Sequence, residues 1–332
     1  MSKKGLSYVF NKELPVIKEG WKGNIVLNGQ FSNDGVPVYP PLWSVLKWKL
    51  GRNPQKKEKA QDTFKLSVFP QGELSTEKDK IIWLGHASFI LVVNGVTLLT
   101  DPVFFDIPTI KRKCPLPFSL EKLQPIDYLL VSHDHRDHLD KKSLEVIAKQ
   151  NPDVEALLPL ETGRHFDSDL LKGIKKQEAG WYQEYKIDKD IRIIFLPTHH
   201  WCKRGIFDFN QTLWGSFLII HGDKKIFFAG DSAYSSVFRG IRQEFGEMDI
   251  CILPIGAYAP QFMMKDAHMT PEEAVQVFQD LGGKTLIPMH YGTFDLSDEP
   301  VGEPIRRLDK RFRQVADNQV LVKLDVGKDY WL

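Results

Sequence analysis

Short runs of apolar residues, each followed by a turn and a polar side chain, recur along the chain from residue 80 onward. Runs of about four to eight apolar residues that end in this way are typical of buried strands. Residues 80–102 are expected to form two strands joined by Asn94 and Gly95, because an Asn-Gly pair favours the tight turn of a β-hairpin. Further strands are predicted in the segments IDYLLVSH, IRIIFLPTHH, SFLIIHGDKKIFFAGD, DICILPIGAY and KTLIPMH.

Two helices are predicted between these strands. The segment KKSLEVIAKQ follows Asp140, and the segment TPEEAVQVFQDLGG carries helix signals at both of its ends. Thr270 and Glu273 fit a capping box, in which each residue satisfies a backbone N–H of the other. Pro271 suits the first turn of this helix and Gly282 suits its exit. The order of elements predicts a mixed α/β protein.

The composition is that of a folded globular protein. The chain has 332 residues, of which 42% are hydrophobic and 26% charged, so intrinsic disorder is not expected. No repeat of fixed period and no low-complexity tract interrupts the chain after residue 80. We therefore predict one domain over residues 80–332 and an N-terminal arm over residues 1–79.

The sequence also predicts a compartment. It has no run of the roughly 18 apolar residues that a membrane-spanning helix requires, and its first residues lack the apolar core of a signal peptide. Cys114, Cys202 and Cys251 are too few and too scattered for a disulfide framework. A cytoplasmic location with reduced thiols is expected.

The arm differs from the rest of the chain in charge and in aromatic content. Residues 1–66 hold 12 Lys or Arg against 5 Asp or Glu, although the whole chain carries a net charge of only +1. A short helix is predicted from about Leu42 to Leu50, with Trp43, Leu46 and Leu50 on one face. The arm either packs on the main domain and buries its aromatic rings, or contacts a lipid surface from outside. The aromatic and proline residues concerned are Trp21, Tyr39, Pro40, Pro41, Trp43 and Trp48.

The candidate chemistry is concentrated in the segment SHDHRDHLD, directly after a predicted buried strand. It holds His133, His135, Asp137 and His138 within six positions. Imidazole and carboxylate groups packed this closely lose solvation at a cost unless a cation gathers them. The sequence therefore predicts a divalent-metal site at the end of this strand.

Three more potential ligands follow other predicted strands. They are Asp231 in FFAGD, His290 in LIPMH, and either His199 or His200 in FLPTHH. One of each, added to the first cluster, gives seven ligands, enough for two metals bridged by the aspartate. A closed structural zinc site would instead be rich in cysteine, and the cysteines here do not cluster.

The chain resembles the metallo-β-lactamase superfamily, whose fold is a four-layer αββα sandwich. The motif H-x-H-x-D-H in SHDHRDHLD, with the later His, Asp and His, carries this resemblance. Within the superfamily, further stretches in the same order are similar to N-acyl-phosphatidylethanolamine phospholipase D and its bacterial relatives. These stretches are WLGHASF, TDPVF, HHWCKR, TLWGSF, FFAGD, PIGAY, HMTPEEAVQ and MHYGTF.

The resemblance implies a site with two divalent ions, expected to be Zn²⁺. Asp231 would bridge the two ions. The pattern of a polar residue, the ligand and an aromatic residue selects His200 over His199, although the polar position here is itself a histidine. One ion would be held by His133, His135 and His200, and the other by Asp137, His138 and His290.

The resemblance also implies roles in hydrolysis. A metal-bridging hydroxide, placed with the help of Asp231 and Asp137, would attack a phosphodiester. By the same resemblance His268 lies near the metals and would protonate the leaving group or bind the phosphate. Asp101 would either orient a ligand imidazole or serve only as a turn residue.

The sequence assigns no ligand role to the three remaining histidines, His86, His165 and His221. By family pattern His86 lies near the site, where it would have no more than a packing role. His165 and His221 show no partner signal and are expected to be exposed.

The expected substrate depends on the resemblance. It implies hydrolysis of a phosphodiester in lipids such as N-acyl-phosphatidylethanolamine. The basic and aromatic character of the arm, and not the resemblance, is the reason to expect peripheral membrane contact through it. The alternatives are a sugar-phosphate lactonase, a nuclease and a non-catalytic metal-binding protein. A nuclease would show a strong salt dependence of binding, and we expect no nucleic-acid partner.

Overall fold

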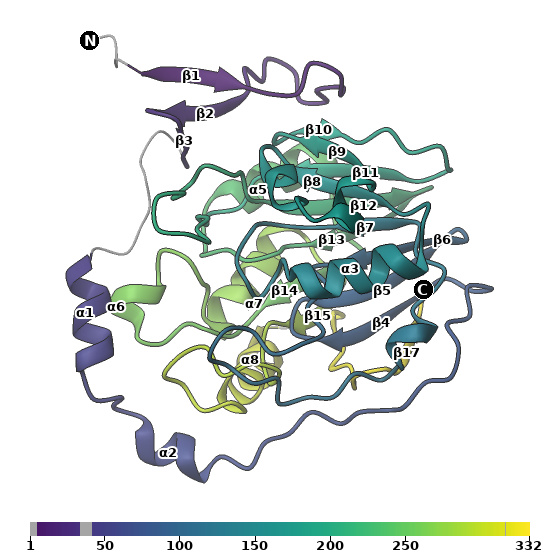
Figure 1. Ribbon diagram of the computed structural model, residues 1–332. Coiled ribbons are helices and arrows are strands. Elements are labelled where there is room, and N and C mark those ends of the chain that lie inside the picture. The colour runs from purple at the N-terminus through teal and green to yellow at the C-terminus, as the bar shows by residue number, and fades with distance from the viewer. Residues whose placement is uncertain (1–4, 34–41, 316) are drawn as a thin grey trace.

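The computed structural model describes residues 5–33, 42–315 and 317–332, and two facing β-sheets form its centre (Figure 1). The first sheet has the order β17-β4-β5-β6-β7-β8-β9, with bounds Asp329–Trp331, Lys80–Gly85, Ser88–Val93, Val96–Thr100, Tyr128–Leu130, Glu155–Pro159 and Lys175–Ala179. The second has the order β10-β11-β12-β13-β14-β15-β16, with bounds Gln183–Glu184, Arg192–Leu196, Ser216–His221, Lys224–Phe228, Ile250–Pro254, Thr285–Met289 and Val320–Leu321.

The strands β4, β5 and β6 of the first sheet are buried at every position, and most of their residues are apolar. Side chains of a strand alternate between its two faces. Ile81 and Trp83 therefore join the core between the sheets, whereas Ile82 and Leu84 join the core on the outer side. This burial on both sides explains why the strands read as continuous apolar runs in the sequence.

Helices cover the outer faces of both sheets. On the first sheet, α3 (Lys141–Gln150) and α4 (Asp169–Lys172) contribute to the outer core. On the second sheet, α7 (Pro271–Asp280) contacts β14 and lies between α5 (Val237–Phe245) and α8 (Glu303–Val315). The predicted αββα order of layers is confirmed. The short helices are α1 (Leu42–Leu50), α2 (Lys56–Gln61), α6 (Gln261–Met264), η1 (Leu120–Lys122) and η2 (Thr162–His165).

Local signals identified two of these helices correctly. Asp140 caps α3 by accepting a hydrogen bond from the Ser143 backbone N–H. The predicted capping box between Thr270 and Glu273 is present at the start of α7. The helix α8, the longest described one, was not predicted, although its apolar residues recur at helical spacing.

The segment 80–102 forms three strands, so the prediction of two was wrong. Asn94 and Gly95 make the predicted turn between β5 and β6, both with positive φ. A second reversal separates β4 from β5, where Gly85 and His86 also have positive φ. The isolated Gly85 inside an apolar run is the signal that marked this turn.

The sheet topology brings several strand ends to one edge of the sandwich. In the first sheet β6, β7, β8 and β9 run parallel to one another, and in the second β13, β14, β15 and β16 do. The carboxyl ends of parallel strands meet at the same edge of their sheet. Loops that leave these ends can therefore place side chains close together.

Part of the arm forms a small sheet and part is attached beside the second sheet. The strands β1 (Leu6–Val9), β2 (Asn24–Leu27) and β3 (Gln30–Phe31) pair with one another, and α1 lies next to α6 (Figure 1). Trp48 Nε1 donates to Asp298 Oδ1 at 3.0 Å, and Asn53 Nδ2 donates to the Asp298 carbonyl at 2.8 Å. These contacts attach α1 to the segment that follows β15.

The helix expected from Leu42 to Leu50 is confirmed, but the expectation that the arm buries its aromatic rings is only partly right. Trp21 is half-buried against Tyr182, with ring centroids 4.9 Å apart. Trp43 is 60% exposed, because no described element covers its face of α1. Tyr39, Pro40 and Pro41 lie outside the described residues.

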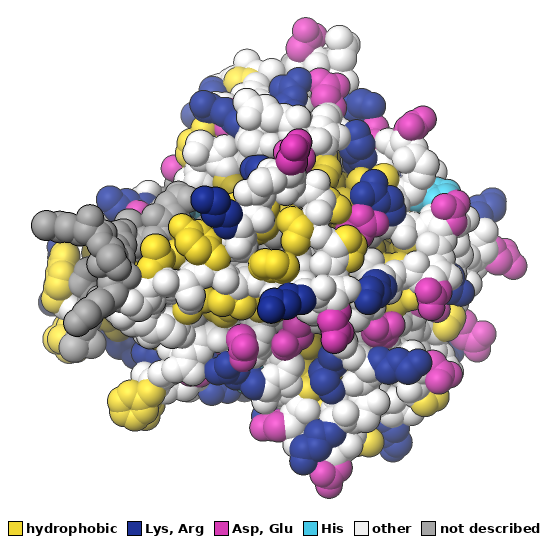
Figure 2. Space-filling view, turned by 90° about the horizontal axis from the view of Figure 1, so that it is seen from above, with side chains coloured by type: hydrophobic (Ala, Val, Ile, Leu, Met, Phe, Trp, Pro, Cys, Tyr) yellow, Lys and Arg dark blue, Asp and Glu magenta, His cyan; other side chains and the backbone are white. Residues whose placement is uncertain are grey.

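Hydrophobic side chains also lie on other parts of the surface. In Figure 2 they form a band from the left edge to the centre of the face seen from above, whereas charged side chains of both signs surround this band. Among the described residues, no helix is long and apolar enough to cross a membrane.

Candidate metal centre

The predicted site residues follow strands that end at the same edge of the sandwich. The segment of His133 to His138 follows β7, and Asp231 follows β13. His290 comes directly after β15, and His200 comes four residues after the end of β11. The two sheets therefore both contribute side chains to one site.

One group of three imidazoles lies in this site. His133 Nε2 is 3.0 Å from His135 Nδ1, and His200 Nε2 is 3.2 Å from the same nitrogen. One ring nitrogen from each of the three histidines lies within 4.8 Å of the others. His133 and His200 are buried, so these nitrogens face one another in a small volume.

A second group lies beside the first. Asp137 Oδ2 is 3.4 Å from His290 Nε2 and 3.7 Å from His138 Nε2. His86 also belongs to this group, since its Nε2 lies 3.1 Å from Asp137 Oδ2. The position of His86 goes beyond the packing role that was expected for it.

Asp231 lies between the two groups. Its Oδ2 is 3.1 Å from His138 Nε2 and 3.1 Å from His290 Nε2. The same carboxylate also forms a potential ligand group with His200 and His268. Asp231 is therefore placed where a bridging ligand would have to be.

Some buried donor atoms of this site lack hydrogen-bond partners, as is expected of atoms that bind a metal. His135 Nε2 and Asp231 Oδ1 are buried and make no hydrogen bond with any described residue. Buried polar atoms without partners are rare in native proteins and destabilise the fold. Nitrogen and carboxylate oxygen in a tetrahedral or five-coordinate arrangement are the ligands that zinc and similar divalent ions accept.

The buried carboxylates of the site are paired with imidazoles, and they raise the pKa of His138 well above its usual value and that of His290 to about 9, so a divalent ion would have to displace these protons. Burial alone would raise the pKa of Asp231, but His138 and His290 hold that pKa well below its ordinary value. Burial alone would also raise the pKa of Asp137, and His138, His290 and His86 hold it low as well. Both carboxylates are therefore ionised at neutral pH. Burial lowers the pKa of His200 well below its usual value, which leaves a neutral imidazole with a lone pair to donate.

Neighbouring groups orient several of the imidazoles. Asp101 Oδ2 lies 2.7 Å from His138 Nδ1, and Ser132 Oγ lies 2.9 Å from His133 Nδ1. His200 Nδ1 donates to the backbone carbonyl of Ala267 at 2.8 Å. Each of these contacts turns the opposite ring nitrogen, Nε2, toward the site.

Asp101 therefore takes the orienting position that was one of its two predicted roles. It also accepts a hydrogen bond from the Ser132 backbone N–H at 2.6 Å. Sequence reasoning missed Ser132 and the Ala267 carbonyl. No residue pattern could have identified the carbonyl, because every residue has one.

His268 lies at the rim of the site. Its Nδ1 is 3.6 Å from Asp231 Oδ2, and its ring centroid is 5.3 Å from that of His200. Burial lowers the pKa of His268 to about 4, so its imidazole is neutral at neutral pH. His268 is therefore placed to donate one hydrogen bond to a group bound beside Asp231.

The other histidines are separate from the site. His199 lines a neighbouring cavity instead of the group that contains His200. The expectation that His165 is exposed was wrong, because its Nε2 lies 3.0 Å from the buried carboxylate of Asp134. His221 is partly exposed, and its Nδ1 donates to the Asp190 carbonyl.

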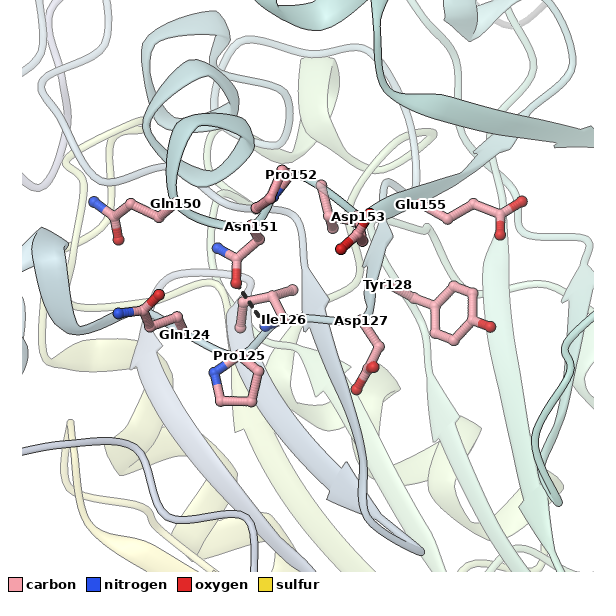
Figure 3. Close-up of a pocket in the computed structure, with 11 residues that line it drawn as sticks. Gln124, Pro125, Ile126, Asp127, Tyr128, Gln150, Asn151, Pro152, Asp153 and Glu155 are labelled. Atoms are coloured by element: carbon pink, nitrogen blue, oxygen red, sulfur yellow. Dashed lines mark hydrogen bonds between the residues drawn. The ribbon is translucent and has the colours of Figure 1, made fainter.

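A pocket of about 460 Å³ lies at the opposite ends of β7 and β8 (Figure 3). Its wall includes Asp127, Asp153 and Glu155, and Asn151 accepts a hydrogen bond from the Ile126 backbone N–H there. No histidine or cysteine lines this pocket among the described residues. The candidate chemistry therefore belongs to the other edge of the sandwich.

The amino-acid sequence is similar to one known domain family and to several named proteins. The sequence model of the beta-lactamase superfamily domain matches residues 97–291. An N-acyl-phosphatidylethanolamine-hydrolyzing phospholipase D of Caenorhabditis elegans is 32% identical over 262 residues, which cover 74% of each chain. A mitochondrial protein of Saccharomyces cerevisiae carries the same activity in its name and is 33% identical over 238 residues. The matched region covers 68% of this chain but only 50% of the yeast protein.

A solved structure agrees on the fold. A metallo hydrolase from the archaeon Ignicoccus hospitalis superposes with a TM-score of 0.57 over 76% of this chain and 97% of its own. Its sequence identity is 20%, so the likeness concerns the fold alone.

Proposed function

Because this chain belongs to the metallo-β-lactamase superfamily and is a metal-dependent hydrolase, we propose that it hydrolyses a phosphodiester bond in lipids of the N-acyl-phosphatidylethanolamine type. The observation that carries the proposal is the position of Asp231 between two groups of ligands. Sites with two metals are suited to hydrolysis of phosphate esters. The names of the nematode and yeast relatives supply the lipid class.

The candidate ligands would form two metal sites that share Asp231. His133, His135 and His200 would hold one ion, Asp137, His138 and His290 the other, and Asp231 both. Two divalent ions, in our proposal Zn²⁺, would supply a hydroxide at neutral pH and withdraw charge from a phosphoryl oxygen.

His268 would bind the phosphate group of the substrate. Its imidazole is neutral, and its Nδ1 makes no hydrogen bond with a described residue. A hydrogen bond from this ring to a phosphoryl oxygen would strengthen as negative charge develops there in the transition state. His268 follows α6, so the same segment would connect the phosphate to the surface around α1.

The surface near α1 supports a lipid as substrate. Trp43 and Leu50 are 60% and 84% exposed, and Phe262 on the adjacent α6 is 40% exposed. Lys47 lies over the Phe262 ring, with its Nζ 4.6 Å from the ring centre. Exposed aromatic and aliphatic side chains with interspersed lysines are typical of surfaces that enter the interfacial layer of a membrane. We propose peripheral membrane contact through this face.

The test is release of phosphatidic acid from N-acyl-phosphatidylethanolamine by purified protein loaded with zinc. The Asp137→Asn variant serves as the matched inactive form, since it keeps the size of the side chain and removes its charge. We expect turnover by the wild type and almost none by the variant. A protein that holds two metals but releases no phosphatidic acid would contradict the lipid assignment and direct the search to lactones and other phosphodiesters.

A further inference from the structure

The loop of residues 203–209, between β11 and β12, exposes two neighbouring hydrophobic side chains beside the candidate metal centre. Ile206 is 79% exposed and Phe207 is 88% exposed, the largest exposed fraction of any large hydrophobic residue that the structure describes. Single exposed hydrophobic residues are common on protein surfaces. Two adjacent ones that are almost fully exposed are unfavourable in water and indicate an interaction surface.

Hydrogen bonds within the loop hold these two side chains outward. The Asp208 carboxylate accepts from the backbone N–H of Gly205 at 2.7 Å and from that of Arg204 at 3.3 Å, which closes the turn. Gln211 Nε2 donates to the backbone carbonyl of Phe207 at 3.0 Å. The exposure of the tip therefore results from a defined turn.

The same loop is attached to the segment that carries candidate metal ligands. Arg204 Nη1 donates to the backbone carbonyl of Asp134 at 2.6 Å and to that of Leu139 at 2.7 Å. The Trp201 ring, at the base of the loop, lies edge to face with the His135 ring, with centroids 4.6 Å apart. The exposed tip therefore has a fixed position relative to the metal centre.

Positive charge surrounds the tip. Lys203 and Arg136 are exposed, and Arg136 Nη2 donates to the backbone carbonyl of Arg204 at 3.1 Å. Asp208 is the only acidic residue of the loop, and its carboxylate already accepts from two backbone N–H groups. Three cations against one carboxylate attract an anionic surface.

We propose that Ile206 and Phe207 insert into an anionic lipid bilayer, with Lys203 and Arg136 at the level of the lipid headgroups. A fluid bilayer closes around a protruding apolar tip and offers anionic headgroups to the cations beside it. The inference rests on the proposed function, because a lipid substrate lies in such a surface. It adds a contact that is separate from the exposed face of α1.

The two contacts adjoin the metal centre from different segments. The 203–209 loop follows His200, whereas α6, which lies beside α1, precedes His268. The rings of His200 and His268 have centroids only 5.3 Å apart. A protein held by both contacts would therefore present this part of the metal centre to the bilayer.

The test is sedimentation of the whole zinc-loaded chain with vesicles of phosphatidylcholine and phosphatidylglycerol that contain no N-acyl-phosphatidylethanolamine. We expect binding that becomes at least about tenfold weaker when phosphatidylglycerol is omitted. Replacing Ile206 and Phe207 together by serine should lower the partition coefficient at least about tenfold, because it removes the inserted apolar area.

Val320→Ser is the control for loss of exposed apolar surface elsewhere. Val320 is 51% exposed and pairs with Thr285 at the start of β15, whereas His290 follows the end of that strand. The variant therefore changes the opposite edge of the sheet and should bind vesicles as the wild type does.

Insertion itself can be measured with a polarity-sensitive dye attached to Phe207→Cys. The three natural cysteines are buried, so the dye reacts with the introduced thiol. We expect a blue shift of the dye emission when anionic vesicles are added. The same dye on Asp223→Cys, in the exposed turn between β12 and β13, should show no shift.

Three results would overturn the proposal. The first two are unchanged vesicle binding by the double variant and the absence of a blue shift at position 207. The third is a double variant that separates a dimer into monomers without lipid and still binds vesicles, which would assign the tip to a contact between two copies of the chain. If the double variant does not fold, the dye measurement decides alone.

These vesicles contain no proposed substrate, so the result does not depend on turnover. A wild type that inserts its tip but releases no phosphatidic acid from N-acyl-phosphatidylethanolamine would contradict the proposed function only. A wild type that releases phosphatidic acid but shows no insertion would contradict this inference only.

Discussion

The carboxylate of Asp101 lies 2.7 Å from Nδ1 of His138 and turns the Nε2 of that imidazole toward Asp231. Both residues are fully buried, and the two side chains come from the ends of neighbouring parallel strands, β6 and β7. This contact fixes the orientation of a potential metal ligand that the loop alone would leave free to rotate.

Asp101→Asn should therefore weaken the binding of the ion that we propose is held by His138. The amide has the size of the carboxylate but loses its charge, and such changes beside a ligand imidazole reduce metal affinity by about 10- to 100-fold. The measurement is metal content after dialysis against a weak chelator. Asp106→Asn, at an exposed position of the same loop, should keep both ions. Full metal content in Asp101→Asn would show that the carboxylate does not orient His138.

His268→Ala should lower turnover by about a hundredfold without removing metal, because in the proposed function this residue binds the phosphate and holds no ion. The measurements are kcat on N-acyl-phosphatidylethanolamine and metal content of the same preparation. Loss of one ion would instead make His268 a ligand, as its proximity to His200 and Asp231 also permits.

Replacing Trp43 and Leu50 together by serine should reduce binding to phospholipid vesicles at least about tenfold. Both side chains are exposed, so the change removes apolar contact area without opening a cavity in the core. Hydrolysis of a short-chain, water-soluble substrate should be unchanged. Lys310→Ser, on the main domain, is a control that should leave vesicle binding unaffected. Equal vesicle binding by the double variant would show that this face of α1 is not the lipid contact.

Asp62→Asn should reduce stability by about 1–3 kcal/mol at neutral pH. Burial alone would raise the pKa of Asp62, but the Arg306 guanidinium and the backbone N–H groups of Gly302 and Phe64 lower it overall. A carboxylate with a lowered pKa in the folded state contributes stability above its ordinary pKa of about 4 and loses it as the pH falls further.

The difference in unfolding free energy between wild type and Asp62→Asn should therefore be constant above about pH 5 and shrink below about pH 4. Urea unfolding at a series of pH values measures it. A difference that stays the same down to about pH 3 would mean that the charge of Asp62 contributes nothing.

Local signals predicted much of the fold and nearly all the candidate ligands. The capping box of α7 involves residues three positions apart, and the ligands each follow an apolar strand, so short segments carry this information. The four-layer order came from the family resemblance, because the pairing of β13 with β14 joins segments that are far apart in the sequence.

Contacts between distant segments account for what was missed. His165 has no neighbour in sequence that would reveal Asp134 as its partner, since the two meet only in the folded chain. The helical spacing of Trp43, Leu46 and Leu50 placed them on one face correctly. It could not show whether another element covers that face, because coverage depends on the path of the whole arm.

The attachment of the arm to Asp298 links the arm to the loop of a candidate metal ligand. Asp298 lies eight residues after His290, in the segment that also receives hydrogen bonds from Trp48 and Asn53. A chain truncated before residue 54 would lose both hydrogen bonds to Asp298. A lower turnover of that truncated protein could then result either from weaker membrane attachment or from weaker metal binding, and the two causes could not be distinguished. Point replacements on the outer face of α1 leave these hydrogen bonds intact. The arm therefore contributes to the position of the segment that follows the candidate ligand His290.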